Sequence, residues 1–238
     1  MRHEEPPLPA HRAALWLGGA CLILGSLAIF AFRLAHGDAP AANPEAHLRF
    51  IAHHPAYAAV HLGAILGVLL WVGGLIALAG TLSPPRAQLL GRWGTACVLI
   101  GAAIFSIDFT IDGVAGQDLA TAWAAATPAA HADLVRAAHT ALTMLRGPSL
   151  VAIVLLWGLP LLLFGSAVLL EGYPAWLGWS GLAVGAVTIL AALVLLLQPD
   201  VFPGVLVYGL LASIVVPLWS VGLGLGMWRR AGASGRSR

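Results

Sequence analysis

Two aspartates stand one helical turn apart in the segment "SIDFTIDGVAGQDLATAW", residues 106–123, directly after a long stretch that is almost free of charge. Asp108 and Asp112 share one face of a helix, because side chains at positions i and i+4 stack above each other. His61 likewise lies inside an apolar run, "AYAAVHLGAILG". An ionisable side chain within a membrane-spanning segment is costly, so it indicates a binding site or a proton pathway.

Imidazole and carboxylate groups together form a ligand set for zinc, iron, manganese or copper(II). A further histidine, His139, belongs to the segment that follows the aspartates, and we expect it at a similar depth. We therefore predict His61, Asp108 and His139 as metal ligands. Asp112 would act as an acid or base, or as the hydrogen-bonding partner of a ligand.

The type of cofactor is left open by the sequence, but a transition metal ion is favoured over haem. Haem would need two axial histidines from opposite sides, and His139 lies on a segment that need not enter the membrane. Two other histidines of the same side, His36 and His47, are expected to lie outside the site, so their replacement should not affect it.

Other interpretations remain open at this stage. Asp108 and Asp112 could be helix-end residues paired with Arg136 or Arg146, and Asp-Gly at 112–113 is typical of a helix stop. The chain could then be an accessory subunit of a membrane complex without chemistry of its own. A small-ligand site or a small transporter is a further alternative, although a transporter usually carries broken helices and charges nearer the bilayer midplane.

The composition decides the class of protein. The chain has 238 residues, of which 60% are hydrophobic and only 9% charged, whereas a soluble domain is about a quarter charged. A single polytopic membrane domain over 1–238 follows, with the lipid bilayer as its first partner. The formal net charge of +2 gives no reason to expect a nucleic-acid partner, and Cys21 and Cys97 fall inside apolar runs without metal or disulfide spacing.

The apolar runs predict an all-α bundle of six transmembrane helices. An amphipathic helix at about 128–146 is expected on the outer surface, ended by Gly147-Pro148. Pro160 and Pro217 should kink the spans that contain them, and the pair Gly63-x-x-x-Gly67 should allow close helix packing. The spans are placed at 13–34, 56–81, 89–112, 149–170, 177–198 and 204–228.

The distribution of arginine sets the orientation. Eight of the twelve basic residues fall on the side of the two termini in this topology: Arg2, Arg12, Arg86, Arg92, Arg229, Arg230, Arg236 and Arg238. The positive-inside rule then places both termini in the cytoplasm and the His/Asp residues on the outside. The absence of lysine and the abundance of alanine, glycine and leucine favour a GC-rich bacterial genome.

The segments "IDGVAGQDLATAW" and "YPAWLGWSGLAVGA", together with the span that carries His61, resemble the uncharacterised six-helix integral membrane proteins of bacteria that are grouped as domains of unknown function. The resemblance covers the spans and not the N-terminal dozen residues. It implies six helices in a bacterial inner membrane. It implies no activity, and no functional residue is carried over from it.

Overall fold

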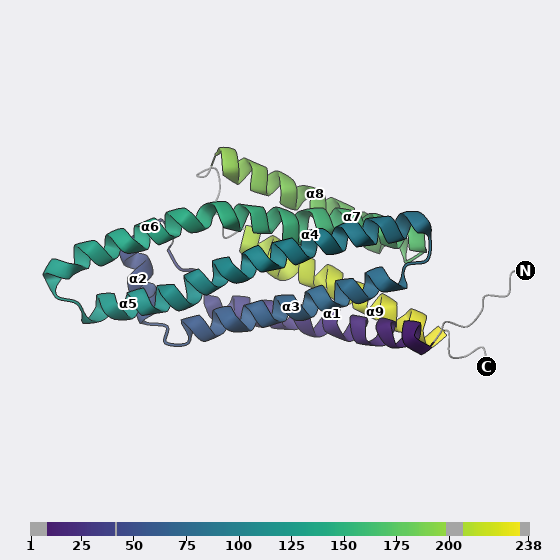
Figure 1. The fold of residues 1–238 in the computed structure, drawn as a ribbon, viewed down its shortest axis with the longest axis horizontal. Coiled ribbons are helices and arrows are strands. Elements are labelled where there is room, and N and C mark those ends of the chain that lie inside the picture. Colours follow the sequence, from purple (N-terminus) through teal and green to yellow (C-terminus); the bar gives the residue numbers. More distant parts are fainter. Residues whose placement is uncertain (1–8, 41, 199–206, 234–238) are drawn as a thin grey trace, which may run out of the picture.

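A computed structural model describes residues 9–40, 42–198 and 207–233, and every regular element within these ranges is helical (Figure 1). The elements are α1 (Pro9–His36), α2 (Pro44–Ala52), α3 (Tyr57–Thr81), α4 (Pro85–Thr110), η1 (Ile111–Ala115), α5 (Gly116–Ala125), α6 (Pro128–Ala152), η2 (Ile153–Gly158), α7 (Leu159–Glu171), α8 (Ala175–Leu197), η3 (Val207–Val215) and α9 (Val216–Ala233). The three η elements are turns of π-helix, which continue an α-helix with a wider turn.

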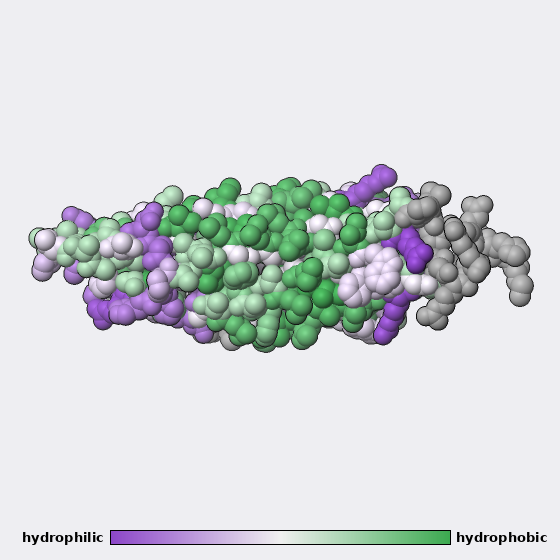
Figure 2. All heavy atoms as spheres, turned by 90° about the horizontal axis from the view of Figure 1, so that it is seen from below, coloured by the Kyte–Doolittle hydropathy of each residue, from purple (hydrophilic) through white to green (hydrophobic). Residues whose placement is uncertain are grey.

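Six helical stretches of the described chain are long and apolar enough to cross a membrane, which confirms the predicted bundle: Ala10–His36, Tyr57–Thr81, Pro85–Ala125, Pro128–Glu171, Ala175–Leu197 and Gly209–Ala233. The first part of the last predicted span, 204–206, lies outside the described residues. The protein is therefore a multi-pass membrane protein. On the face drawn in Figure 2, a broad hydrophobic band covers the middle of the molecule and hydrophilic residues gather toward its ends, as a bilayer requires.

The spans form an elongated bundle in which α1 begins and α9 ends at the same end (Figure 1). At the opposite end two helical runs project beyond the others, one made of α4, η1 and α5 and the other begun by α6. The short helix α2 packs against both of these projections. Its residues Leu48 and Ile51 join Tyr57, Ala120 and Ala138 in a small apolar core of their own. These contacts join α2, which we call the cap, to α3, α5 and α6.

Two predicted helix ends are wrong. The chain does not turn at Asp112-Gly113, because the π-turn η1 carries the helix on into α5. Nor does Gly147-Pro148 end a separate surface helix at 128–146, because α6 runs through Pro148 and continues by η2 into α7. A proline removes one backbone hydrogen bond, and a helix held by neighbouring helices tolerates that loss without ending.

Prolines and glycines shape the spans in the way that their types suggest. The π-turns η2 and η3 come directly before Pro160 and Pro217, where a proline ring would crowd the carbonyl of the preceding turn. Gly63 and Gly67 face α1 closely: a Cβ at Gly67 would lie 3.0 Å from the Cβ of Ala28. The predicted close packing at this glycine pair is confirmed.

Buried hydrogen bonds join the spans where they cross. The indole Nε1 of Trp71 on α3 donates to the hydroxyl of Ser220 on α9 over 2.7 Å, and both residues are almost fully buried. The indole Nε1 of Trp219 donates to the Leu177 carbonyl on α8, also over 2.7 Å. In an apolar interior an unpaired indole N–H would be costly, so these bonds fix which helices meet.

Candidate functional site

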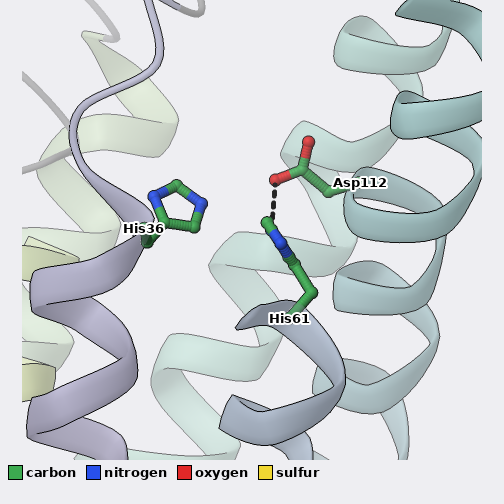
Figure 3. A group of neighbouring side chains, drawn as sticks. All are labelled: His36, His61 and Asp112. Atoms are coloured by element: carbon green, nitrogen blue, oxygen red, sulfur yellow. Dashed lines mark hydrogen bonds and ion pairs between the residues drawn. The ribbon is translucent and has the colours of Figure 1, made fainter. Parts of the chain in front are cut away.

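A group of histidine and aspartate side chains lies at the end of the bundle opposite the termini, where α1 ends and α3 begins. His36 is the last residue of α1, His61 lies one turn into α3, and Asp112 lies in η1. One ligand atom from each of these three lies within 4.8 Å of the others (Figure 3). The three residues are thus brought from separate helices to a common point at the ends of their spans, away from the described termini.

The proton of His61 is assigned by its hydrogen bonds. Its Nδ1 lies 2.9 Å from the backbone carbonyl oxygen of Tyr57, which can only accept, so Nδ1 carries the hydrogen. In a neutral ring, Nε2 is then an acceptor, and it lies 3.1 Å from Oδ2 of Asp112. The His61 side chain is completely buried. Two acceptors at this distance repel unless a positive charge, either a proton or a metal ion, lies between or beside them.

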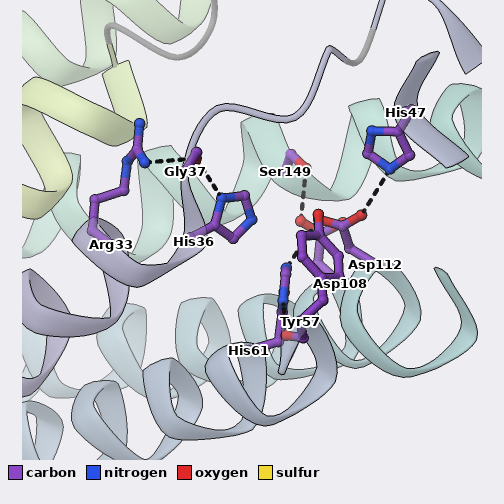
Figure 4. Close-up of polar contacts among 9 residues, drawn as sticks. All are labelled: Arg33, His36, Gly37, His47, Tyr57, His61, Asp108, Asp112 and Ser149. Atoms are coloured by element: carbon purple, nitrogen blue, oxygen red, sulfur yellow. Dashed lines mark hydrogen bonds and ion pairs between the residues drawn. The ribbon is translucent and has the colours of Figure 1, made fainter. Parts of the chain in front are cut away.

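His36 repeats the same arrangement. Its Nδ1 lies 2.8 Å from the carbonyl oxygen of Gly37, so Nδ1 carries the hydrogen. In the neutral ring, Nε2 then has a free lone pair that points away from the backbone of α1. Gly37 has φ +67, a left-handed conformation that ends α1 and that glycine adopts without strain. Its carbonyl also accepts from the Arg33 guanidinium over 2.8 Å. Arg33 also pairs with Asp38. Figure 4 shows Arg33 and His36 both hydrogen-bonded to Gly37, with the His36 ring beside the cluster.

Asp112 is the centre of the group. His47 on α2 approaches its other oxygen, Oδ1, with Nε2 at 3.7 Å, and the Tyr57 hydroxyl lies 3.4 Å from Oδ2 (Figure 4). The His47 ring is 7% exposed, and its Nδ1 has no hydrogen-bond partner among the described residues. One carboxylate is therefore surrounded by three imidazoles from three helices, and the cap formed by α2 supplies the third.

The π-turn explains how Asp112 reaches His61. Gly113 follows Asp112, and a Cβ at this glycine would lie 2.4 Å from the Cβ of His61 and 2.5 Å from its Cγ. Only glycine allows η1 to approach α3 this closely. A π-turn shifts the direction of later side chains compared with an α-helix, and such turns are frequent at functional sites.

Asp108 takes a different place from Asp112, one turn deeper. Its Oδ2 accepts a hydrogen bond of 2.6 Å from the Ser149 hydroxyl on α6, and Oδ1 has no partner among the described residues. The residue is 5% exposed. The two aspartates that the sequence places on one helix face therefore serve two different neighbours.

The predicted site is assembled only in part. His61 and Asp112 meet, whereas Asp108 lies beside them and His139 is exposed on α6 without a described contact to the group. The expectation that His36 and His47 lie outside the site is wrong, since both rings face Asp112 or its partner. One signal in the sequence could have indicated His36: it ends the first apolar run, near the level at which the second run begins, with His61 one helical turn inside.

The group borders a cavity of about 860 Å³ between the helices. His36, His47 and Asp112 line its outer part, while Ile29, Val68, Phe105, Ile153 and Trp157 line the part that reaches between the spans. The cluster is therefore open to a space large enough for a small molecule.

Comparison of the chain with protein-family models, with curated proteins and with solved structures finds no match. The resemblance to six-helix bacterial membrane proteins stays a prediction, and the assignment of function rests on the site alone.

Proposed function

We propose that this membrane protein binds a divalent transition-metal ion through His36, His61 and Asp112, at the outward-facing end of its helix bundle. His47 is the candidate fourth ligand. The bound ion would lie at the wall of the adjoining cavity, so the protein is a metal-binding protein of a bacterial inner membrane with space for a small molecule beside the ion. The orientation with both termini in the cytoplasm follows from the arginine distribution.

The observation that carries the proposal is the contact between Nε2 of His61 and Oδ2 of Asp112. With Nδ1 committed to the Tyr57 carbonyl, Nε2 presents a lone pair to a carboxylate 3.1 Å away. Backbone carbonyls that accept from Nδ1 are the usual partners of metal-binding histidines, because they fix the ring for coordination by Nε2. His36 has the same kind of partner in the Gly37 carbonyl.

A proton alone is a weaker explanation of the group. One proton on His61 would satisfy one contact with Asp112, but it would leave the second ring, His36, with its lone pair directed at an imidazolium–carboxylate pair. A metal ion accepts lone pairs from several rings and from the carboxylate together. The cluster offers three to four such donors, which is the number that zinc uses in proteins.

Nitrogen and oxygen donors without thiolate favour zinc, with manganese, iron and copper(II) as competitors. Bonds of about 2.0–2.1 Å in a tetrahedron separate the ligand atoms by about 3.4 Å. All separations in the cluster are within 4.8 Å, so the largest would shorten by no more than about 1.4 Å on binding. His36 is the last residue of α1, so a small shift of this helix end would bring its ring closer while the bond to the Gly37 carbonyl is kept.

The test is a zinc titration of the protein purified in mild detergent and stripped with a chelator. We expect one ion per chain, with an affinity that falls by at least about tenfold in His61→Ala and Asp112→Asn, because each removes a ligand. His139→Ala is the matched control: it removes an exposed imidazole on α6 and should leave zinc binding unchanged.

Stripped protein that binds no zinc, manganese, iron or copper(II) above background would overturn the proposal. Equal losses in His61→Ala and His139→Ala would do the same, since they would show that the ions bind to histidines without regard to the cluster. In either case the contact of His61 with Asp112 would be an ion pair that serves packing.

A further inference from the structure

The cavity next to the metal cluster is lined by a buried carboxylate with one oxygen that nothing in the described chain satisfies. Oδ1 of Asp108 has no partner, although the residue is 5% exposed and lines the cavity. Its other oxygen is held by the Ser149 hydroxyl at 2.6 Å, so the carboxylate has a fixed direction. A buried, unpaired carboxylate oxygen is costly and is best explained by a partner that donates a hydrogen bond.

The cations of the cavity rim are already engaged. Arg33 donates to the Gly37 carbonyl and pairs with Asp38, and Arg146 donates to the Leu195 carbonyl over 3.1 Å. An anionic head group would therefore have to displace these contacts and approach the carboxylates. A cationic head group would meet two guanidinium groups that line the same space. A neutral group with an O–H donor satisfies Asp108 and meets neither difficulty.

The deeper part of the cavity is lined mainly by apolar side chains and extends into the membrane. Val68 lies eleven residues after the start of α3 at Tyr57, which corresponds to roughly 16 Å along a helix. This is about half the thickness of the hydrocarbon layer. Close to Asp108 the walls carry the rings of Phe105, Phe109 and Trp157. The Phe105 and Trp157 rings meet edge to face with centroids 5.6 Å apart, a surface suited to a planar ring.

We infer that this cavity binds a membrane-soluble phenol of the hydroquinone class, with a ring hydroxyl donating to Oδ1 of Asp108 and an apolar tail between the spans. The volume of about 860 Å³ lies in the range of known small-molecule sites and accommodates a substituted ring with a short tail. This site is distinct from the proposed metal site, since Asp108 faces α6 while Asp112 faces α1, α2 and α3.

The probe is an alkyl-tailed hydroquinone, kept reduced under anaerobic conditions, and its comparator is the dimethyl ether of the same compound. Binding is measured by equilibrium dialysis on the full chain in nanodiscs after chelator treatment, so that no metal takes part. We expect saturable binding of the hydroquinone and at least about tenfold weaker binding of the ether, because the ether cannot donate a hydrogen bond to a buried carboxylate.

Two variants locate the site. Asp108→Leu keeps a similar shape without an acceptor, and it should reduce hydroquinone affinity to that of the ether while zinc affinity is retained as proof of folding. Ala64→Phe places a ring in the cavity and should weaken both compounds. If Asp108→Leu does not fold, the ratio of hydroquinone to ether affinity in the unaltered protein still tests whether a hydrogen-bond donor is required for binding.

Equal affinity for hydroquinone and ether would overturn the inference and would leave the cavity as a slot for lipid chains. Absence of saturable binding would overturn it as well. Failure of zinc binding with intact hydroquinone discrimination would refute the proposed function alone, so the two proposals fail separately.

Discussion

Replacement of Gly113 by alanine should damage the metal site without adding or removing any ligand. The added Cβ would lie 2.4 Å from the Cβ of His61, whereas carbon atoms in contact prefer about 3.5–4.0 Å. Either η1 or the His61 backbone must therefore move by about 1 Å or more. Metal ligands must lie within about 0.2 Å of their ideal distances. The His61 ring is tied by Nδ1 to the Tyr57 carbonyl and is completely buried, so it cannot turn to follow a displaced Asp112.

The assay is the same zinc titration, with Gly116→Ala as the matched control. A Cβ at Gly116 would meet its nearest neighbour, Cδ1 of Ile51, at an ordinary contact distance of 3.4 Å, three residues along the same helical run. Loss of a group that positions a ligand typically reduces metal affinity by about 10–100-fold. We expect a loss of this size in Gly113→Ala and none in Gly116→Ala. A folded Gly113→Ala protein with unchanged zinc affinity would refute the close approach of η1 to α3 as the basis of the site.

Three further predictions concern the cluster, the core and the orientation. His36→Ala should weaken zinc binding by at least about tenfold because it removes a ligand, and an effect no larger than that of His54→Ala, measured by the same titration, would exclude His36 from the site. Ser220→Ala should lower the melting temperature in detergent, because the buried Trp71 indole loses its acceptor at a cost of about 1–3 kcal/mol; an unchanged melting temperature would mean that the indole finds another partner. A cysteine in place of Thr127, between α5 and α6, should react with a membrane-impermeant maleimide in intact cells while one in place of Ser83 should not; the reverse pattern would invert the orientation.

The membrane bundle could be predicted from the sequence because its signal is the length and apolarity of each run, which depends on no tertiary contact. Helix ends were less predictable. Gly113 and Pro148 are typical helix terminators in water, but here the chain passes through both, since contacts with neighbouring helices outweigh local preference. Because the chain stays helical at both positions, α5 and α6 project beyond the ends of the other spans.

Only those site residues could be predicted that stand inside an apolar run of the sequence. His61 and the aspartates stood out because ionisable residues in apolar runs are costly. The separate roles of Asp108 and Asp112 could not be foreseen, because the π-turn at Ile111–Ala115 changes the direction of the helix surface between them. His47 was missed because α2 lies in a connection between spans, and only its packing against α5 and α6 brings the ring to Asp112.

The most direct test of the account is X-ray absorption spectroscopy at the zinc edge on the zinc-loaded protein, compared with His61→Ala. The account predicts nitrogen and oxygen neighbours at about 2.0–2.1 Å with the outer-shell scattering of imidazole, and the loss of one imidazole or of the metal itself in the variant. A spectrum without imidazole scattering, or one that His61→Ala leaves unchanged, would contradict the assignment of the metal to this cluster.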